Sequence, residues 1–221
     1  ALALDLSLRE MELNLDDYMK LVWNTYGKIE KPYTVEDLKN TLIVVAISMF
    51  GIILSSAAGY GFAKFNFRHK EKLFILVLAT MMVPSQVTMV PNYLVLNNIG
   101  LVNTFLGIAL PGLVTAFSIF LFRQFMQTIP DDVIESARIE GCSEIYIFFK
   151  IILPMAKPIL AIQAILTFIG SWNSFLWPLI IATSSSKYTL SIGLSLLQGQ
   201  NTADTPLQMA GATLMVLPVM I

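Results

Sequence analysis

Five long stretches of this sequence contain no Asp, Glu, Lys or Arg, and they constrain the fold more than any other feature. Residues 41–63, 73–96, 104–122, 158–182 and 207–221 are charge-free, so all 14 basic and 15 acidic residues lie outside them. A helix needs about 20 apolar residues to cross the ~30 Å core of a bilayer, and the first four stretches have that length. A buried helix of a soluble protein normally keeps a charged face, which these stretches lack. The sequence therefore predicts an all-α membrane protein, a polytopic bundle of transmembrane helices.

The two ends of the sequence interrupt this pattern. The chain begins at Ala1 without an initiating Met, has no span before residue 41, and ends within an apolar stretch. We expect a segment of a longer protein that lacks an earlier span and the C-terminal end. Residues 1–40 precede the first span in the sequence, and the basic loops described next predict that they form an extracytoplasmic N-terminal segment.

The basic residues between the spans predict which loops face the cytoplasm. Lys and Arg near the ends of spans favour the cytoplasmic side. Residues 64–72 and 123–157 each contain four of them, whereas residues 97–103 contain none and residues 183–206 contain one. We therefore expect the first two segments in the cytoplasm and the last two outside.

Small residues recur along the first span. Gly51, Ser55 and Gly59 follow one another at intervals of four, which places them on one face of a helix. Such a face lets the backbones of two membrane helices approach closely. We expect a helix–helix contact there.

Prolines fall within every span after the first. Pro84 and Pro91 are expected to interrupt the second span, because proline removes a backbone donor and neighbours or water must satisfy the freed carbonyl. Kinked packing and a transport path explain these prolines equally well. The others are Pro111, Pro178 and Pro218.

Polar side chains within the spans favour the transport path. An amide that faces lipid is costly, so Gln86, Gln163 and Asn173 are expected to face a neighbouring helix or water. Trp172 offers a flat aromatic face beside Asn173, a combination that binds sugars. We predict that these four residues contribute to a substrate pathway; the alternative is that Trp172 anchors its span and Asn173 bridges to a neighbouring helix.

The long cytoplasmic connection 123–157 carries signals for two short helices. Pro130 suits the first helical position, and Gly141 is a natural C-terminal stop. A second helix is expected from about Ser143. Two such helices lying across the membrane surface suit a groove on a cytoplasmic partner, although an interfacial helix without a partner remains the alternative. The prolines expected to break the second helix are Pro154 and Pro158.

Several functions lack their motifs in this sequence. There is no G-x-x-x-x-G-K-[ST] loop for ATP phosphates, no cluster with metal-ligand spacing, and no nucleophile with a base at motif distance. We therefore expect no catalytic or metal site. The single cysteine, Cys142, excludes an internal disulfide and fits a reducing compartment. No basic, aromatic-interleaved patch indicates nucleic-acid binding.

The stretch ESARIEGCSEIYIFFKIILPMAKP, residues 135–158, resembles the EAA motif of the membrane subunits of binding-protein-dependent ABC importers. Three positions depart from the motif: Ser136 and Cys142 replace Ala, and Glu140 replaces Asp. GLVNTFLGIALPG, FLFRQFMQTIPDDVIESA, SWNSFLWPLI and YTLSIGLSLLQGQ extend the likeness to the maltose-type branch of the carbohydrate-importer permeases. The residues that match the motif are Glu135, Ala137, Gly141, Phe148, Ile151, Leu153, Pro154 and Pro158.

This resemblance implies a type I-like importer fold in the bacterial cytoplasmic (inner) membrane. The 123–157 connection would contain the coupling helix that docks on a cytoplasmic ATPase. The implied partners are a second related permease, two ATPase copies that bind ATP and Mg, and an extracytoplasmic solute-binding protein. The chain itself would bind no cofactor. The implied docking residues are Glu135, Ser136, Ala137, Glu140, Gly141, Cys142 and Phe148.

Three alternatives remain open. Related permeases carry polyols or glycerol phosphates instead of saccharides. An ion-coupled secondary transporter would want acidic or His residues within the spans, and the charge-free stretches have none. A membrane scaffold without translocation is the third.

Overall fold

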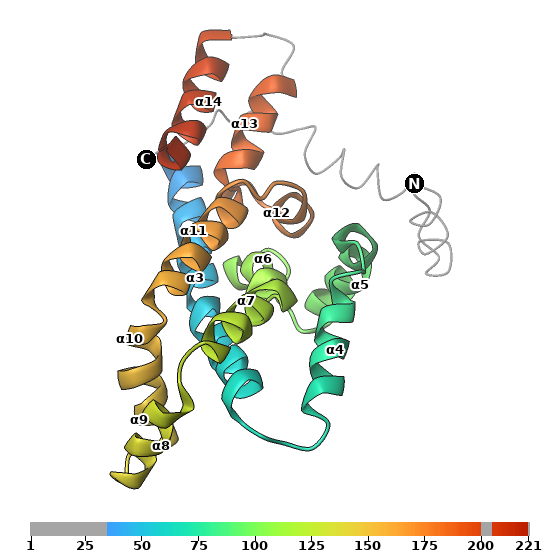
Figure 1. Ribbon diagram of the computed structural model, residues 1–221. Helices are drawn as coiled ribbons and strands as arrows, with labels where there is room; N and C mark the ends of the chain where they lie inside the picture. The colour runs from blue at the N-terminus through green and yellow to red at the C-terminus, as the bar shows by residue number, and fades with distance from the viewer. Residues whose placement is uncertain (1–34, 200–204, 221) are drawn as a thin grey trace. The chain divides into compact units, whose positions relative to one another are not determined.

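The computed structural model describes residues 35–199 and 205–220, which form helices and connections without a strand (Figure 1). The helices are α3 (Val35–Lys64), α4 (Lys70–Thr80), α5 (Ser85–Asn98), α6 (Phe105–Ala109), η1 (Leu110–Gly112), α7 (Ala116–Gln127), α8 (Asp131–Ile139), α9 (Glu144–Ile147), η2 (Phe148–Ile152), α10 (Leu153–Met155), α11 (Lys157–Trp172), α12 (Leu176–Ile181), η3 (Ser185–Lys187), α13 (Leu190–Gly199) and α14 (Thr205–Met220). The predicted all-α fold is confirmed for the described part of the chain.

The chain divides into two compact units. One, here called the coupling unit, comprises residues 47–83 and 112–168. The other, here called the outer unit, comprises the described residues before 47, residues 84–111 and those from 169 onward. The segment before residue 35, predicted to be extracytoplasmic, lies outside the described residues.

Apolar helices long enough to cross a bilayer are present. Among the described residues, α3 is long and apolar enough to do so as one helix. The number of candidate spans rises to four if each pair of helices that meets at a bend counts as one broken span. The predicted fourth span, residues 158–182, consists of α11 and α12 separated by a break that begins at Asn173.

The small-residue face of α3 packs inside the coupling unit. Gly51, Ser55 and Gly59 are all buried. A Cβ added at Gly59 would lie 2.4 Å from the Cβ of Phe122, and one at Gly51 would lie 1.8 Å from the carbonyl oxygen of Leu113. The predicted helix–helix contact is therefore confirmed, and it is made with α7 and the residues just before it.

The core of the coupling unit joins α3, α7 and the helices that follow α7. Phe122 and Met126 of α7 are completely buried. Because the residues around them are apolar and come from five helices, burying them holds the end of α3 against the connection after α7. The buried members of this core, the coupling core, are Ile52, Tyr60, Phe122, Met126, Ile129, Ile134, Ala137, Ile147, Phe148, Ile152, Ala156 and Ile159.

The outer unit is held by polar contacts between its loops. Asn103 has φ +61°, a conformation that Asn tolerates better than most residues. Its side-chain oxygen accepts hydrogen bonds from the backbone N–H groups of Thr183 and Ser184, at 3.2 and 3.1 Å. The Trp177 indole donates to the carbonyl of Gly107, at 3.2 Å. The Asn103 bonds fasten the loop before α6 to the loop after α12, and the Trp177 bond joins α12 to α6.

The prolines act differently from one another. Pro84 stands in extended conformation (ψ 133°) immediately before α5, so the predicted interruption there is confirmed. The predicted interruption at Pro91 is wrong, because Pro91 lies inside α5. Pro218 likewise lies inside α14. A proline lacks one backbone bond, and an apolar helix continues through it where its surroundings satisfy the freed carbonyl.

Candidate functional site

The connection between α7 and α11, residues 128–156, is here called the docking segment. Its first helix, α8, begins at Asp131, and Asp131 and Asp132 place negative charge in the first turn, where the helix dipole favours it. Pro130 was predicted as the first helical residue, but its ψ of 137° makes it the N-cap. An N-cap residue has extended backbone, and the fixed φ of proline is compatible with that role.

Helix α8 is amphipathic. Ile134 and Ala137 are buried in the coupling core. On the opposite side Glu135, Ser136 and Ile139 are exposed, and Ile139 keeps 87% of its surface accessible. The helix therefore attaches by one face and presents an acidic face that carries the exposed apolar side chain of Ile139.

Gly141 closes α8. Its φ is +83°, a backbone angle that residues other than Gly, Asn and Asp rarely adopt. Its N–H donates to the carbonyl of Arg138, and the N–H of Cys142 donates to the carbonyl of Ala137, both at 3.0 Å. This pair of bonds is the Schellman closure, in which a left-handed residue turns the chain and satisfies terminal carbonyls. No atom lies within 4 Å of a Cβ built at Gly141, so the requirement for glycine comes from the backbone angle.

The second helical part begins after Ser143, whose hydroxyl accepts from the N–H of Tyr146 at 3.3 Å. It runs through α9, a π turn (η2) and α10, and meets α11 at a bend of 80°. Pro154 and Pro158 were predicted to break it, but Pro154 lies within α10, Pro158 lies in the first turn of α11, and the bend falls between them, at Ala156. The π turn ends at Ile152, two residues before Pro154, and the Leu153 N–H donates to the carbonyl of Phe148, five residues back.

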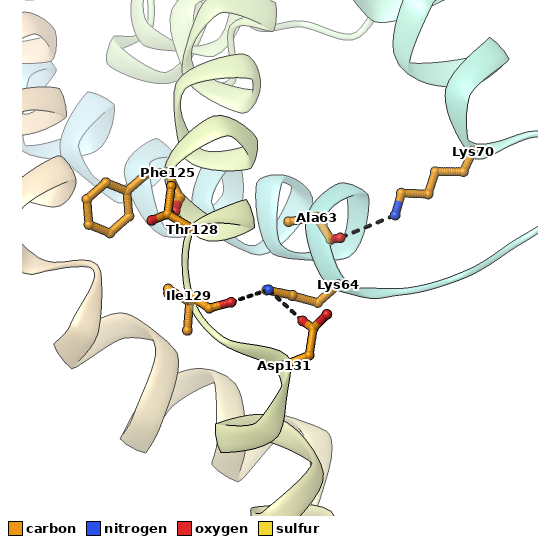
Figure 2. Close-up of polar contacts among 7 residues, drawn as sticks. All are labelled: Ala63, Lys64, Lys70, Phe125, Thr128, Ile129 and Asp131. Atoms are coloured by element: carbon orange, nitrogen blue, oxygen red, sulfur yellow. Dashed lines mark hydrogen bonds and ion pairs between the residues drawn. The ribbon is translucent and has the colours of Figure 1, made fainter.

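Two polar contacts attach the docking segment to the last turns of α3. Figure 2 shows the first: the Lys64 ammonium donates to the carbonyl of Ile129 and to the carboxylate of Asp131, the latter at 2.6 Å. The Lys64 side chain is only 5% exposed, whereas that of Asp131 is 73% exposed. The hydrogen bond and positive charge of Lys64 lower the pKa of Asp131.

The second contact centres on Glu144. One of its carboxylate oxygens accepts from the hydroxyl of Tyr60, at 3.4 Å, and the other accepts from Nε of Arg138, at 2.6 Å. The bond to Glu144 raises the pKa of Arg138. The Tyr60 ring lies 5.6 Å from the Phe148 ring, between centroids. Glu144 therefore links α8, α9 and α3.

The docking residues implied by the EAA resemblance fall into two groups. Ala137 and Phe148 are buried, and Cys142 is half-buried against the coupling core. The other four, Glu135, Ser136, Glu140 and Gly141, are exposed. The first group thus fixes the segment to its own chain, and the second presents a surface.

Sequence reasoning gave no specific role to Lys64, Glu144 or Ile139. Lys64 was counted only as a marker of orientation. Glu144 lies six residues after Arg138, a spacing that no single helix brings together, so the pair forms only because Gly141 turns the chain. Ile139 could have been found as an apolar residue just before a helix stop, outside the face formed by Ile134 and Ala137.

The predicted pathway residue Gln163 is buried in the coupling unit. Its amide nitrogen donates to the hydroxyl of Ser118 on α7, at 2.8 Å, and to that of Thr167, at 3.2 Å. Its carbonyl oxygen has no hydrogen-bond partner among the described residues. The first bond makes Gln163 a bridge between α7 and α11.

The other predicted pathway residues belong to the outer unit. Trp172 is 2% exposed and its indole donates to the carbonyl of Met215, at 2.9 Å, which favours the anchoring alternative. Asn173 is exposed, and its amide donates to Ile169 on its own helix, at 3.0 Å, rather than to a neighbouring helix. Gln86 is exposed in the first turn of α5.

A metal site is not found in the part of the chain that the structure describes, since no three His, Cys, Asp or Glu residues lie close enough to hold an ion.

Comparison with known proteins identifies this architecture. Residues 47–221 match the model of the family described as "Binding-protein-dependent transport system inner membrane component". The chain belongs to this family. It is therefore an inner-membrane transport component, as the EAA motif in the docking segment predicted.

Curated relatives cover most of the chain. It is 37% identical over 179 residues to the arabinooligosaccharides transport system permease protein AraQ of Halalkalibacterium halodurans, covering 81% of this chain and 64% of that protein. It is 35% identical to AraQ of Bacillus subtilis, covering 99% and 76%. The sn-glycerol-3-phosphate transport system permease protein UgpE of Salmonella typhi is 32% identical, covering 90% and 72%. The chain thus spans about two thirds to three quarters of these relatives.

A solved structure has the same fold. It is a bacterial ABC transporter involved in the import of the acidic polysaccharide alginate. The TM-score is 0.75 at 21% identity, with 94% of this chain and 78% of that chain covered. The predicted ABC importer type of bundle is thereby confirmed.

Proposed function

We propose that this chain is a permease subunit of an ATP-binding-cassette importer, with the docking segment as its contact to a cytoplasmic ATPase. The supporting observation is the split character of α8, which buries Ile134 and Ala137 and exposes Glu135, Ser136 and Ile139. The docking segment also exposes Ile145 (73%) and Tyr146 (51%). Several exposed apolar side chains on one short segment suit a protein partner better than water.

The chemistry of transport is divided between subunits in this proposal. ATP and Mg bind to the ATPase, present in two copies, and a second related permease completes the membrane part. An extracytoplasmic solute-binding protein delivers the substrate. Residues 123–157 then face the cytoplasm, because the ATPase contacts the docking segment there. Residues 64–72 lie on the same side, because Lys64 bonds to Asp131 of that segment.

A neutral saccharide is the proposed substrate. AraQ is named for arabinooligosaccharides, and UgpE for glycerol 3-phosphate, so the relatives leave both classes open. A path for a phosphate needs Lys or Arg within the spans to balance its charge. The charge-free stretches contain none, which favours an uncharged substrate.

Reconstituted complexes test both parts of the proposal. Uptake of arabinotriose, and not of glycerol 3-phosphate, is expected; uptake of glycerol 3-phosphate alone would contradict the saccharide assignment. Ile139→Glu should reduce the ATPase that co-purifies with the permease, because it puts a charge on the docking face. Arg68→Glu, which introduces the same side chain at an exposed position outside the segment, is the control. Equal ATPase retention by Ile139→Glu and the control would exclude this docking face.

A further inference from the structure

The two polar contacts of the docking segment converge on one short stretch of α3. Tyr60 and Lys64 lie four residues apart, one helical turn, and so project from the same side of the helix. Tyr60 reaches Glu144 at the start of α9, and Lys64 reaches Asp131 at the start of α8. One turn of α3 therefore contacts the first turn of both helices of the segment.

Burial of the Lys64 side chain restricts which groups its ammonium can bond to. A lysine ammonium that is largely removed from water needs acceptors to offset its lost hydration. Here they are the carbonyl of Ile129 and the carboxylate of Asp131, which both belong to the entry of the docking segment (Figure 2). Neighbouring Lys70 bonds instead to the carbonyl of Ala63, on α3 itself. Of the basic cluster in residues 64–72, here Lys64, Arg68, Lys70 and Lys72, Lys64 is the one that connects α3 to the segment.

The covalent connections of the segment are less direct. Towards α7 the chain passes through non-helical residues 128–130, and towards α11 it passes through the bend at Ala156. Neither connection continues a straight helix into a span. The lateral contact with α3 therefore joins the segment to a long apolar helix without passing through either of these breaks.

We propose that Lys64 is a positioning residue that makes α3 move together with the docking segment, so that closure of the ATPase must displace a membrane span. This inference rests on the proposed function above. It assigns to Lys64 and Asp131 a role in energy coupling in addition to packing. The apolar contacts of the coupling core hold the docking segment against α3. The contact between Lys64 and Asp131, at the edge of that core, makes the two move together.

Basal ATP hydrolysis gives a readout that a merely structural role would not produce. If the membrane spans resist ATPase closure, removing the connection removes the resistance, and the basal rate per complex rises. Because the connection ends on a largely exposed carboxylate, its loss should have a modest effect, and Lys64→Met should raise the basal rate about two- to fivefold. Uptake of arabinotriose should fall, while the KM for ATP and the amount of co-purified ATPase stay unchanged. Simple misfolding would lower both hydrolysis and ATPase retention.

Three further variants sharpen the experiment. Lys64→Arg keeps a cation that can donate to both acceptors and should behave like the parent. Lys72→Met removes an exposed lysine from the same basic cluster and should have no effect. The third variant combines Lys64→Cys and Asp131→Cys in a Cys142→Ala background, and its basal ATP hydrolysis should be as fast as that of Lys64→Met. A short bifunctional thiol reagent replaces the ion pair with a covalent bridge and should restore the parental rate.

Three results would each overturn the proposal. The basal rate of Lys64→Met could equal that of the parent, or it could fall together with the amount of bound ATPase. In the double-cysteine variant, the cross-link could leave the basal rate unchanged. Failure of the docking assignment is distinguishable. In that case Ile139→Glu retains the ATPase, whereas if only the role of Lys64 is wrong, Ile139→Glu loses the ATPase and Lys64→Met behaves like the parent.

Discussion

Replacing Gly141 should weaken docking without preventing insertion of the spans. The demand on this residue comes from its φ of +83°, since among the described residues no atom lies within 4 Å of a Cβ built there. A left-handed conformation costs an ordinary L-residue about 1–2 kcal/mol. One to two kcal/mol changes a two-state ratio by about 5- to 30-fold. Gly141→Ala should therefore shift the docking segment away from its closed turn by about that factor, and the β-branched Gly141→Val should do so more strongly.

The assay is the amount of ATPase retained by permease that has been extracted from membranes in normal yield. Gly141→Asn is the decisive comparison, because Asn is bulkier than Ala yet tolerates the left-handed region. Backbone strain predicts that Asn retains more ATPase than Ala, whereas crowding at the interface predicts the reverse. Gly61→Ala, a helical position with open space around its Cβ, is the control. Parental ATPase retention by Gly141→Val would refute the reasoning.

Two other substitutions test the packing and the pathway. Gly59→Ala places a Cβ 2.4 Å from the Cβ of Phe122, and such overpacking costs about 1–3 kcal/mol. The melting temperature of the purified protein should therefore fall, whereas that of Gly61→Ala should stay at the parental value. Equal melting temperatures for the two variants would contradict the contact. Asn173→Ala should alter the apparent affinity for arabinotriose while the amount of complex stays constant, because the exposed amide bonds only to its own helix; unchanged affinity across several sugars would exclude Asn173 from the pathway.

The sequence was sufficient to predict the helical membrane fold, and the reason is the charge-free stretches. A helix that crosses a bilayer needs about 20 mostly apolar residues. Such a stretch is visible in the sequence without any knowledge of which helices contact one another. The breaks within the helices left no comparable signal. Pro84 precedes a helix and Pro91 lies inside the same helix, and the difference depends on which neighbours satisfy the carbonyls.

The docking segment was predictable in outline for a similar reason. The stop at Gly141 is a local backbone requirement, so the sequence places the turn correctly. Its attachment is not local. Tyr60 and Glu144 are 84 residues apart, and Lys64 and Asp131 are 67 apart. Pairs at such separations depend on how helices pack, which periodicity alone does not specify.

Arg123 illustrates what a count of charges leaves out. It contributes to the basic content that predicts a cytoplasmic loop, yet it is 7% exposed. Its guanidinium makes two bonds to Glu71, at 2.6 and 2.9 Å, donates to the carbonyl of Phe62 at 3.2 Å, and lies 3.8 Å from the centre of the Phe74 ring. A planar, forked cation can satisfy all of these groups at once, and a lysine cannot. The same basic residues that orient a membrane protein during insertion can thus serve afterwards as joints between its helices. In this chain Arg123 joins α7 to α4 and Lys64 joins α3 to the docking segment, so the coupling unit is held by charge as well as by apolar packing.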